Sequence, residues 1–419
     1  MAPRTRPQRG VALLMVVVSI AILAAVAAEF AYRSRVDLEM AVNQRDALRA
    51  EYLAKSSLGL ARMLLMFQKQ LDKTTASLPA LGGGGGGGPA PINMQIWRLA
   101  KVDCLMLQAL LPQAQGRNPK FSIDRTDLVD STGRIQYGGF SGCFDARIED
   151  EQEKLNVNAL VGLQTGTAQG AVQGFYTLIA DKRFDFVFDR EDANKVKATP
   201  ADTLLAIKDW ADDDDTQSTL NVNTLGMVTL QNGFSDESGL YTRYTPRYRS
   251  KNAWFDSLDE LYLVYGVTDR FMAAFGDRLT VFPDPNAPLN VNSNDPVVLA
   301  LILRLFADPA RPDPRLADPV FVDALVQKIL AAKAMLPTGM TVQDFMTIVQ
   351  TAGVQINPQI AQRTGTPGAA NSFLGDKSDT FRIVAVGQAG DVERRVTAVI
   401  RLHDPQQDGL GRVMYWRAD

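Results

Sequence analysis

The chain has few of the residues on which much enzyme chemistry depends. Its 419 residues include one histidine, His403, and two cysteines, Cys104 and Cys143. A single histidine excludes multi-histidine zinc sites, and a Ser/His/Asp triad would have to use His403, although no G-x-S-x-G nucleophile elbow is present. Two cysteines are too few for a disulfide scaffold, so they form either one bridge in an oxidising compartment or two separate buried thiols.

The chain also lacks a global excess of positive charge. Its net charge is -3, which gives no indication of a nucleic-acid partner. Arg4, Arg6 and Arg9 make only the extreme N-terminus basic, a pattern typical of targeting segments. With 46% hydrophobic residues, a chain of this length can bury real cores and is expected to form two or three domains.

A long apolar run follows the basic N-terminus. Residues 11–28 are apolar except for Ser19, and as a helix they would cover about 27 Å, which nearly spans a bilayer. A cleaved secretory signal is the alternative, because AAVAAEF could pass as a cleavage site. Against cleavage, residues 29–73 contain no proline and continue the helical pattern, with apolar residues at Leu38, Ala41, Ala47 or Leu48, Tyr52, Leu60, Leu64 and Phe67. The preceding arginines predict a cytoplasmic N-terminus and a periplasmic remainder.

These features resemble the class III signal of type IV pilins and type II secretion pseudopilins. The basic leader ends in Gly10, and an apolar helix starts at Val11 and runs into an amphipathic half. The resemblance implies that a prepilin peptidase cuts between Gly10 and Val11, that the new N-terminus is methylated, and that the apolar part is kept. Most such proteins have glutamate at the fifth mature position, which here is Met15. The K-type minor pseudopilin is the exception, and a missing carboxylate suits a tip subunit with no N-terminal ammonium above it to pair.

The C-terminal region gives the clearest strand signal. In DVERRVTAVIRL, alternate apolar residues share one face, and with DTFRIVAVG before and GRVMYWRAD after, the pattern predicts a three-stranded antiparallel meander. FDARIED near residue 147 predicts another strand, which turns at residues 151–153 into KLNVN. Residues 94–112 are predicted to form an amphipathic helix. A long helix laid on such a sheet is the α+β pilin-like fold.

Residues 161–350 have a mainly helical pattern, with short apolar segments separated by Pro, Gly, Asn or Asp. The K-type pseudopilin has a large helical insertion of SAM-like or helix-hairpin-helix character at this point, and phrases such as KLNVNAL, IKDWADDD and FDSLDELYLVYGV match it. The motif L-N-V-N occurs at 155–158, 220–223 and 289–292, which we interpret as a short strand ending in a capping Asn.

The resemblance divides the chain into seven parts: a leader peptide (1–10), the transmembrane half of the N-terminal helix (11–28), its periplasmic half (29–77), a Gly-rich linker (78–93), a pilin-like α/β part (94–160), the helical SAM-like insertion (161–350) and the C-terminal antiparallel strands of the pilin-like part (351–419).

An acidic cluster is the main candidate site. Residues 209–215, DWADDDD, hold five carboxylates that must be solvated, paired or bound to a cation. Oxygen ligands without His or Cys favour Ca²⁺, although Gln217 and Asn223 stand where an EF-hand needs Gly and Glu. In the K-type family the phrase D-W-x-D-x-D contributes to calcium sites, which implicates Asp209, Asp212 and Asp214. Glu237 best matches a later acid, with Asp236 as a substitute, because about twenty residues are inserted between.

The resemblance implies a non-enzymatic structural subunit at the tip of the type II secretion pseudopilus, anchored in the bacterial inner membrane. Its implied partners are the I, J and H minor pseudopilins, the major pseudopilin, the prepilin peptidase and the inner-membrane assembly platform, with no nucleic acid. Two alternatives stay open. A helix-hairpin-helix binding module is opposed by Asp256, Asp259 and Glu260, which would repel DNA. A metal-dependent hydrolase would need a base or nucleophile that the sequence does not place beside the aspartates.

Overall fold

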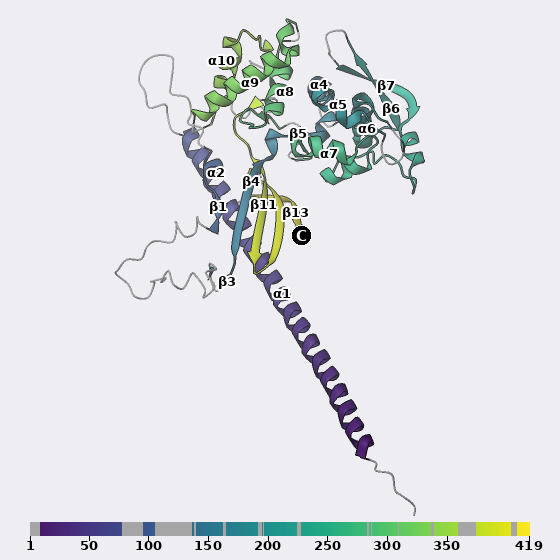
Figure 1. Cartoon of the computed structure of the whole chain (residues 1–419). Helices are drawn as coiled ribbons and strands as arrows, with labels where there is room; N and C mark the ends of the chain where they lie inside the picture. Colours follow the sequence, from purple (N-terminus) through teal and green to yellow (C-terminus); the bar gives the residue numbers. More distant parts are fainter. Residues whose placement is uncertain are drawn as a thin grey trace, which may run out of the picture.

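One long helix lies along a small sheet, and a helical region stands at the end opposite the N-terminus (Figure 1). This computed structural model describes residues 9–77, 95–104, 136–137, 140–161, 165–191, 195, 197–223, 228–282, 285, 287–308, 310–336, 339–358, 374–403 and 409–419. The predicted linker at 78–93 and most of the leader lie outside these residues. The fold is α+β, with a pilin-like part and an additional helical region.

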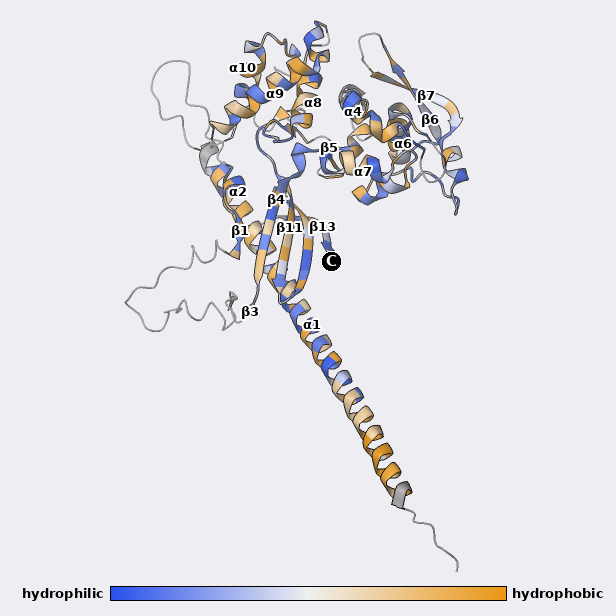
Figure 2. Cartoon of the chain, in the orientation of Figure 1, coloured by the Kyte–Doolittle hydropathy of each residue, from blue (hydrophilic) through white to orange (hydrophobic). Residues whose placement is uncertain are grey.

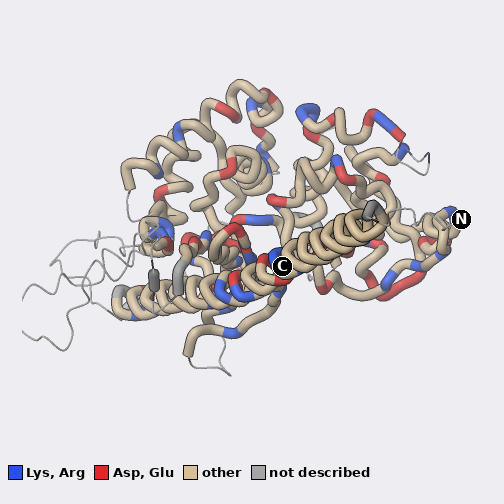
Figure 3. Tube along the Cα trace, turned by 60° about the horizontal axis from the view of Figure 1, so that its bottom comes forward, with Lys and Arg blue, Asp and Glu red and all other residues tan. Residues whose placement is uncertain are grey.

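Helix α1, Arg9–Ser77, runs without interruption for 69 residues. Its first part is strongly apolar and carries no charge over residues 11–28 (Figures 2 and 3). No residue of its most apolar 18-residue window is buried, and it is the one helix among the described residues that is long and apolar enough to cross a membrane. Among the described residues these side chains have no apolar partner, as expected of a segment whose solvent is lipid.

The second part of α1 packs on a five-stranded antiparallel sheet. The strand order is β1 (Val102–Asp103), β4 (Cys143–Asp150), β11 (Thr380–Ala389), β12 (Val392–Arg401) and β13 (Arg412–Ala418). The predicted C-terminal meander is confirmed as β11 to β13, and β4 joins it by pairing with β11, where Ile148 lies opposite Ile383. Alternate residues of each central strand face the helix because side chains on a strand repeat every two residues.

The face of α1 that meets the sheet differs from the predicted apolar stripe. The buried residues are mostly small or one turn apart: Ala50, Leu53, Ala54, Leu58, Ala61 and Leu65. The predicted Leu48, Tyr52 and Phe67 stay 59%, 57% and 61% exposed. The reason is close backbone approach, because a Cβ on Gly387 of β11 would lie 2.0 Å from the Ala50 carbonyl oxygen. Small residues, Ala50 and Ala54, therefore occupy the point of closest approach, while leucines fill the rest of the buried face.

The predicted helix over residues 94–112 is wrong in its described part. Helix α2 covers only Ile96–Leu99, and the chain then extends as β1, where Val102 pairs with Ala146 of β4. Cys104, at the end of this strand, is joined to Cys143 at the start of β4 by a disulfide with Cα atoms 5.7 Å apart. The pairing of this segment with β4 and the burial of Val102 favour a strand here, although the apolar residues repeat at helical spacing. Helical spacing is a local pattern and does not indicate which distant segment the chain pairs with.

The helical region consists of two lobes. The first helical lobe, residues 155–282, contains α4 (Thr165–Ile179), α5 (Asp185–Phe188), α6 (Pro200–Ala211) and α7 (Asp269–Phe275). The second helical lobe, residues 289–375, contains α8 (Pro296–Phe306), α9 (Pro319–Ala334) and α10 (Val342–Thr351). Each lobe has its own apolar core, and the two meet where α8 packs against α4.

Both lobes open with an L-N-V-N motif and close with a short strand that returns beside it. Strand β5 (Leu155–Asn156) pairs in parallel with β8 (Leu279–Thr280), and β9 (Leu289–Asn290) pairs in parallel with β10 (Leu374–Gly375). The side chain of the last Asn of each motif hydrogen-bonds to both the N–H and the C=O of one residue far along the chain. Asn158 exchanges hydrogen bonds with Phe255 N and O, and Asn292 does the same with Met340 N and O, at distances of 2.8–3.1 Å. The two motifs therefore have the same role, which is to pair with the closing strand of the lobe and to hold a distant segment by hydrogen bonds.

The third L-N-V-N motif does not follow this pattern. It lies in β6 (Thr216–Val222), which forms an antiparallel pair with β7 (Val228–Asp236), and its Asn221 and Asn223 are exposed. The strand pair is an addition to the mainly helical region that the sequence predicts. Its strands contain Thr and Val, which favour extended backbone over helix.

Candidate metal centre

Three carboxylates that the sequence singled out come together beside the β6–β7 pair. Asp209 lies in the last turn of α6, and Asp212 is the C-cap residue of that helix. Glu237 is the first residue of the 3₁₀ helix η5 (Glu237–Arg243), directly after β7. One oxygen from each of the three lies within 4.8 Å of the others. The capping box of Thr199 and Asp202 at the start of α6 fixes where the helix begins and so helps to place its end.

Each of these carboxylates has one oxygen held by the protein and one without a hydrogen-bond partner. Asp209 Oδ2 accepts from the Ser218 backbone N–H at 2.9 Å, and Glu237 Oε1 accepts from the Ser250 hydroxyl at 2.8 Å. Asp209 Oδ1, Asp212 Oδ1 and Glu237 Oε2 are buried and accept no hydrogen bond. Because buried polar atoms are normally satisfied, three such oxygens in one place form a group that could hold a cation.

The cluster carries more negative than positive charge. Lys208 pairs with Asp212 and lies 3.6 Å from Asp209 Oδ1. Burial raises the pKa of Asp209 and of Asp212 above the usual range. Burial, helped by repulsion from the neighbouring aspartates, raises the pKa of Glu237 to about 7 although Ser250 donates a hydrogen bond to it. A bound divalent cation would oppose all three shifts, since it favours the charged form of each carboxylate.

The other predicted acids have different local roles. Asp214 lies outside the group of three, and its carboxylate accepts from the Thr216 backbone N–H at 2.7 Å, which lowers its pKa. Asp236, the substitute considered for Glu237, is exposed and caps η5 by accepting from the Ser238 backbone N–H at 2.9 Å. The structure therefore places Glu237, not Asp236, beside Asp209 and Asp212.

Two neighbours of the cluster could not be found from the sequence. Ser250 belongs to a loop whose sequence has no motif. Asn252 has φ of +49°, and its side-chain nitrogen donates to the Asp214 carbonyl and to Asp215 Oδ1, both at 2.9 Å. Its side-chain oxygen is buried without a hydrogen-bond partner. The donor set is thus entirely oxygen, which suits Ca²⁺ better than a transition metal.

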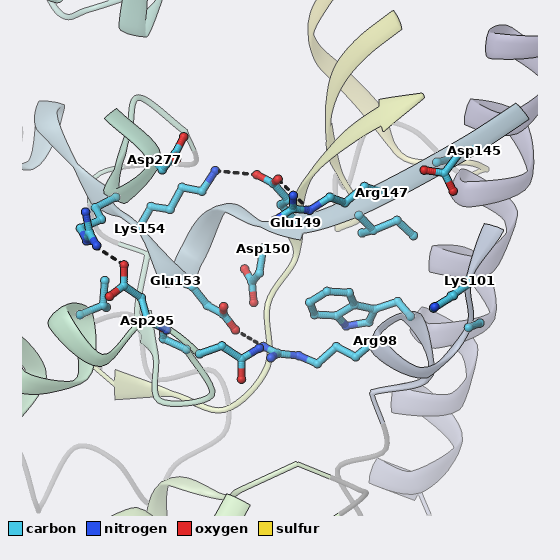
Figure 4. Close-up of a pocket in the computed structure, with 18 of the residues that line it drawn as sticks. Arg98, Lys101, Asp145, Arg147, Glu149, Asp150, Glu153, Lys154, Asp277 and Asp295 are labelled. Carbon is cyan, nitrogen blue, oxygen red and sulfur yellow. Dashed lines mark hydrogen bonds and ion pairs between the residues drawn. The ribbon is translucent and has the colours of Figure 1, made fainter. Parts of the chain in front are cut away.

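A charged groove of about 810 Å³ lies between the sheet and the helical lobes (Figure 4). Arg98 pairs with Glu153, Lys154 lies 3.1 Å from Glu149, and Arg278 lies 2.7 Å from Asp295. Beneath it the buried carboxylate of Asp150 accepts from Asn290, Ser378 and the Gln152 N–H, and burial raises its pKa. These charges largely pair with one another, so we interpret the groove as the joint between the pilin-like part and the lobes.

Part of the chain is similar to a protein of the type II secretion system, although no family model matches it. The chain is 28% identical over 169 residues to type II secretion system protein K of Aeromonas hydrophila, which covers 40% of this chain and 46% of that protein. The chain thus matches less than half the length of this relative. A chain in the crystal structure of the GspK-GspI-GspJ complex of enterotoxigenic Escherichia coli aligns with a TM-score of 0.43 and 15% identity, over 68% of this chain and 83% of that one. Over those 169 residues the chain is a homologue of type II secretion system protein K.

Proposed function

We propose that the chain is a K-type minor pseudopilin, a non-enzymatic subunit at the tip of the type II secretion pseudopilus. The homology to protein K carries this proposal. In this role the chain assembles with the I, J and H minor pseudopilins and the major pseudopilin, and it supports export of folded proteins across the outer membrane. The two helical lobes are then the SAM-like insertion of this class.

The build of α1 supports the proposal. An exposed apolar half continues without a break into a half that packs on the sheet, so one element can be a membrane anchor first and a packing stem later. The arginines before Val11 favour a cytoplasmic N-terminus, with the bulk of the chain in the periplasm. Met15 is 64% exposed on this helix and brings no charge into the apolar segment.

Processing at the leader tests the proposal directly. We expect co-expression with a prepilin peptidase to remove Met1 to Gly10, and the mass of the membrane-extracted chain to begin at Val11. Gly10→Ile should block cleavage because a bulky side chain adjoins the bond that is cut. Gly59→Ala is the matched control, since a Cβ there meets nothing within 4 Å and α1 should form as before. An intact leader on the unaltered chain would overturn the proposal.

We further propose a structural Ca²⁺ held by Asp209, Asp212 and Glu237, with Asp214 close by. The buried oxygens without hydrogen-bond partners in these three residues support it. The ion would supply positive charge where Lys208 alone faces several carboxylates. It would have no catalytic part, because its purpose is to join α6 to the segment that follows β7.

Calorimetry of the full chain in detergent micelles tests this site. We expect Ca²⁺ to bind, and Glu237→Gln to weaken binding at least tenfold because one charged ligand is lost. Asp213→Asn is the matched control, since Asp213 is an exposed neighbour outside the group of three. Absence of heat at millimolar Ca²⁺, or equal loss in both variants, would contradict the proposal.

A further inference from the structure

The proposed calcium ligands flank the β6–β7 pair in the sequence and meet at its base, where Thr216 lies opposite Asp236. Asp209 and Asp212 precede β6, and Glu237 follows β7. Hydrogen bonds tie the strand ends to the same place: Ser218 N–H donates to Asp209 Oδ2, and Glu237 N–H donates to the Asp215 carbonyl at 3.4 Å. Anything that holds the three carboxylates together therefore also holds the base of the strand pair against α6.

The strand pair has few other contacts to fix it. Of its described residues, only Ser218 and Val228 are buried, Leu220 and Leu230 pack half-buried against the core of the first lobe, and Phe234 is fully exposed. Val228 N–H donates to the Gln173 side chain of α4 at 2.8 Å, which gives a second anchor nearer the other end. A segment with few buried apolar contacts opens locally at low free-energy cost. Its order then depends on the contacts at its base.

The strand pair is also unusual in its charge. Residues 216–235 contain no Lys, Arg, Asp or Glu, although exposed edge strands are usually protected by charged side chains. The charged groups nearest to it in the chain lie at its base, in the carboxylates and Lys208. Without a cation, repulsion among these carboxylates weakens the contact between the end of α6 and Glu237, and so weakens the joint between the two strand ends.

We infer that the carboxylate cluster is a calcium-dependent latch that fixes the β6–β7 pair to the end of α6. The inference rests on the calcium proposal and adds a consequence for this chain's own residues. With Ca²⁺ bound, opening of the strand pair requires loss of the ion. Without it, the pair opens at the low cost set by Val228 and the remaining hydrogen bonds. The β6–β7 pair, with Phe234 exposed, is then fully ordered only when calcium is bound.

Hydrogen–deuterium exchange of the full chain in detergent micelles tests the latch. At free Ca²⁺ about 100 times the Kd found by calorimetry, we expect backbone exchange over residues 216–236 to slow about 100-fold relative to EGTA. Helix α9, in the second lobe, should exchange at the same rate in both conditions. Phe234→Ala is the matched control within the β6–β7 pair and should keep both calcium binding and the protection of the backbone amides from exchange. Glu237→Gln should lose both, with Asp212→Asn as the second variant if the first does not fold.

The outcomes separate this inference from the calcium proposal. Calcium binding by calorimetry with unchanged exchange in the strand pair would overturn the latch alone. Slower exchange spread equally over α9 and the strand pair would also overturn it, because the effect would then be general stabilisation. No calcium binding at all would overturn the calcium proposal and the latch together.

Discussion

The two helical lobes are built on one plan and differ in what completes them. Each begins at an L-N-V-N motif, returns to it through a parallel strand, and is bracketed by a buried Asn. The second lobe closes around a continuous apolar core of α8, α9 and α10. The first lobe adds to its own apolar core a cluster of buried carboxylates and an exposed strand pair. Two lobes with the same motif and strand arrangement can therefore differ in whether charged side chains supplement their apolar packing.

The largest expected effects come from the two cores. Phe271 in the first lobe and Phe345 in the second are both almost completely buried, so Phe271→Ala and Phe345→Ala should each cost about 3–5 kcal/mol of local stability. Calcium at 100 times its Kd should restore about 2.7 kcal/mol in the Phe271 variant and nothing in the Phe345 variant. Native-state hydrogen exchange of each lobe measures both. Equal rescue of the two lobes would break the comparison.

Replacing Asn158 or Asn292 should lower stability somewhat less than the Phe substitutions, and by similar amounts in the two lobes. Asn158→Ala and Asn292→Ala each leave a buried backbone N–H and C=O unpaired, at about 1–3 kcal/mol for each group. Asn221→Ala, in the exposed third motif, is the control and should cost less than about 0.5 kcal/mol. Hydrogen exchange of each variant measures these costs, and a large cost at Asn221 would show that the third motif has another role.

The smallest expected effect is a pH dependence of opposite sign in the two lobes. Burial in the metal-free fold raises the pKa of Glu237 from 4.5 to about 7, so the folded state binds this proton more tightly than the unfolded state. That contribution to stability is complete below about pH 4.5 and is lost as the pH rises through about 7. Exchange of α6 amides in EGTA, corrected for intrinsic rates, should therefore show less protection at pH 8 than at pH 5, and Glu237→Gln should weaken this trend. In α9, burial lowers the pKa of Lys333 from 10.5 to about 7, so α9 should show the opposite trend, with more protection at pH 8 than at pH 5.

The helix, the meander and most short helices could be predicted because their signals are local. A run without proline predicted α1, and alternation predicted β11 to β13. The acidic run predicted Asp209 and Asp212 in a common site because residues three apart share a helical face. The choice between Glu237 and Asp236 could not be made locally, since the two acids are adjacent, with Asp236 ending β7 and Glu237 beginning η5.

Contacts that join distant segments were decided by the tertiary structure. Ser250 and Asn252 reach the cluster from a loop about forty residues beyond α6, and no periodic pattern records such an approach. The same holds for the face of α1 that meets the sheet. There the backbone of β11 at Gly387 selects alanines over larger residues, although both sets repeat at helical spacing.

Local sequence patterns were enough to predict the apolar first part of α1, the order of the strands at the C-terminus and the kinds of ligand that any ion would meet. These follow from composition and periodicity, which act within a few turns of chain. Only the tertiary structure decided that Cys104 meets Cys143, that two of the three L-N-V-N motifs are equivalent, and that three carboxylates share one buried place. These contacts depend on which apolar surfaces are buried against each other, and that burial is a property of the whole packed chain.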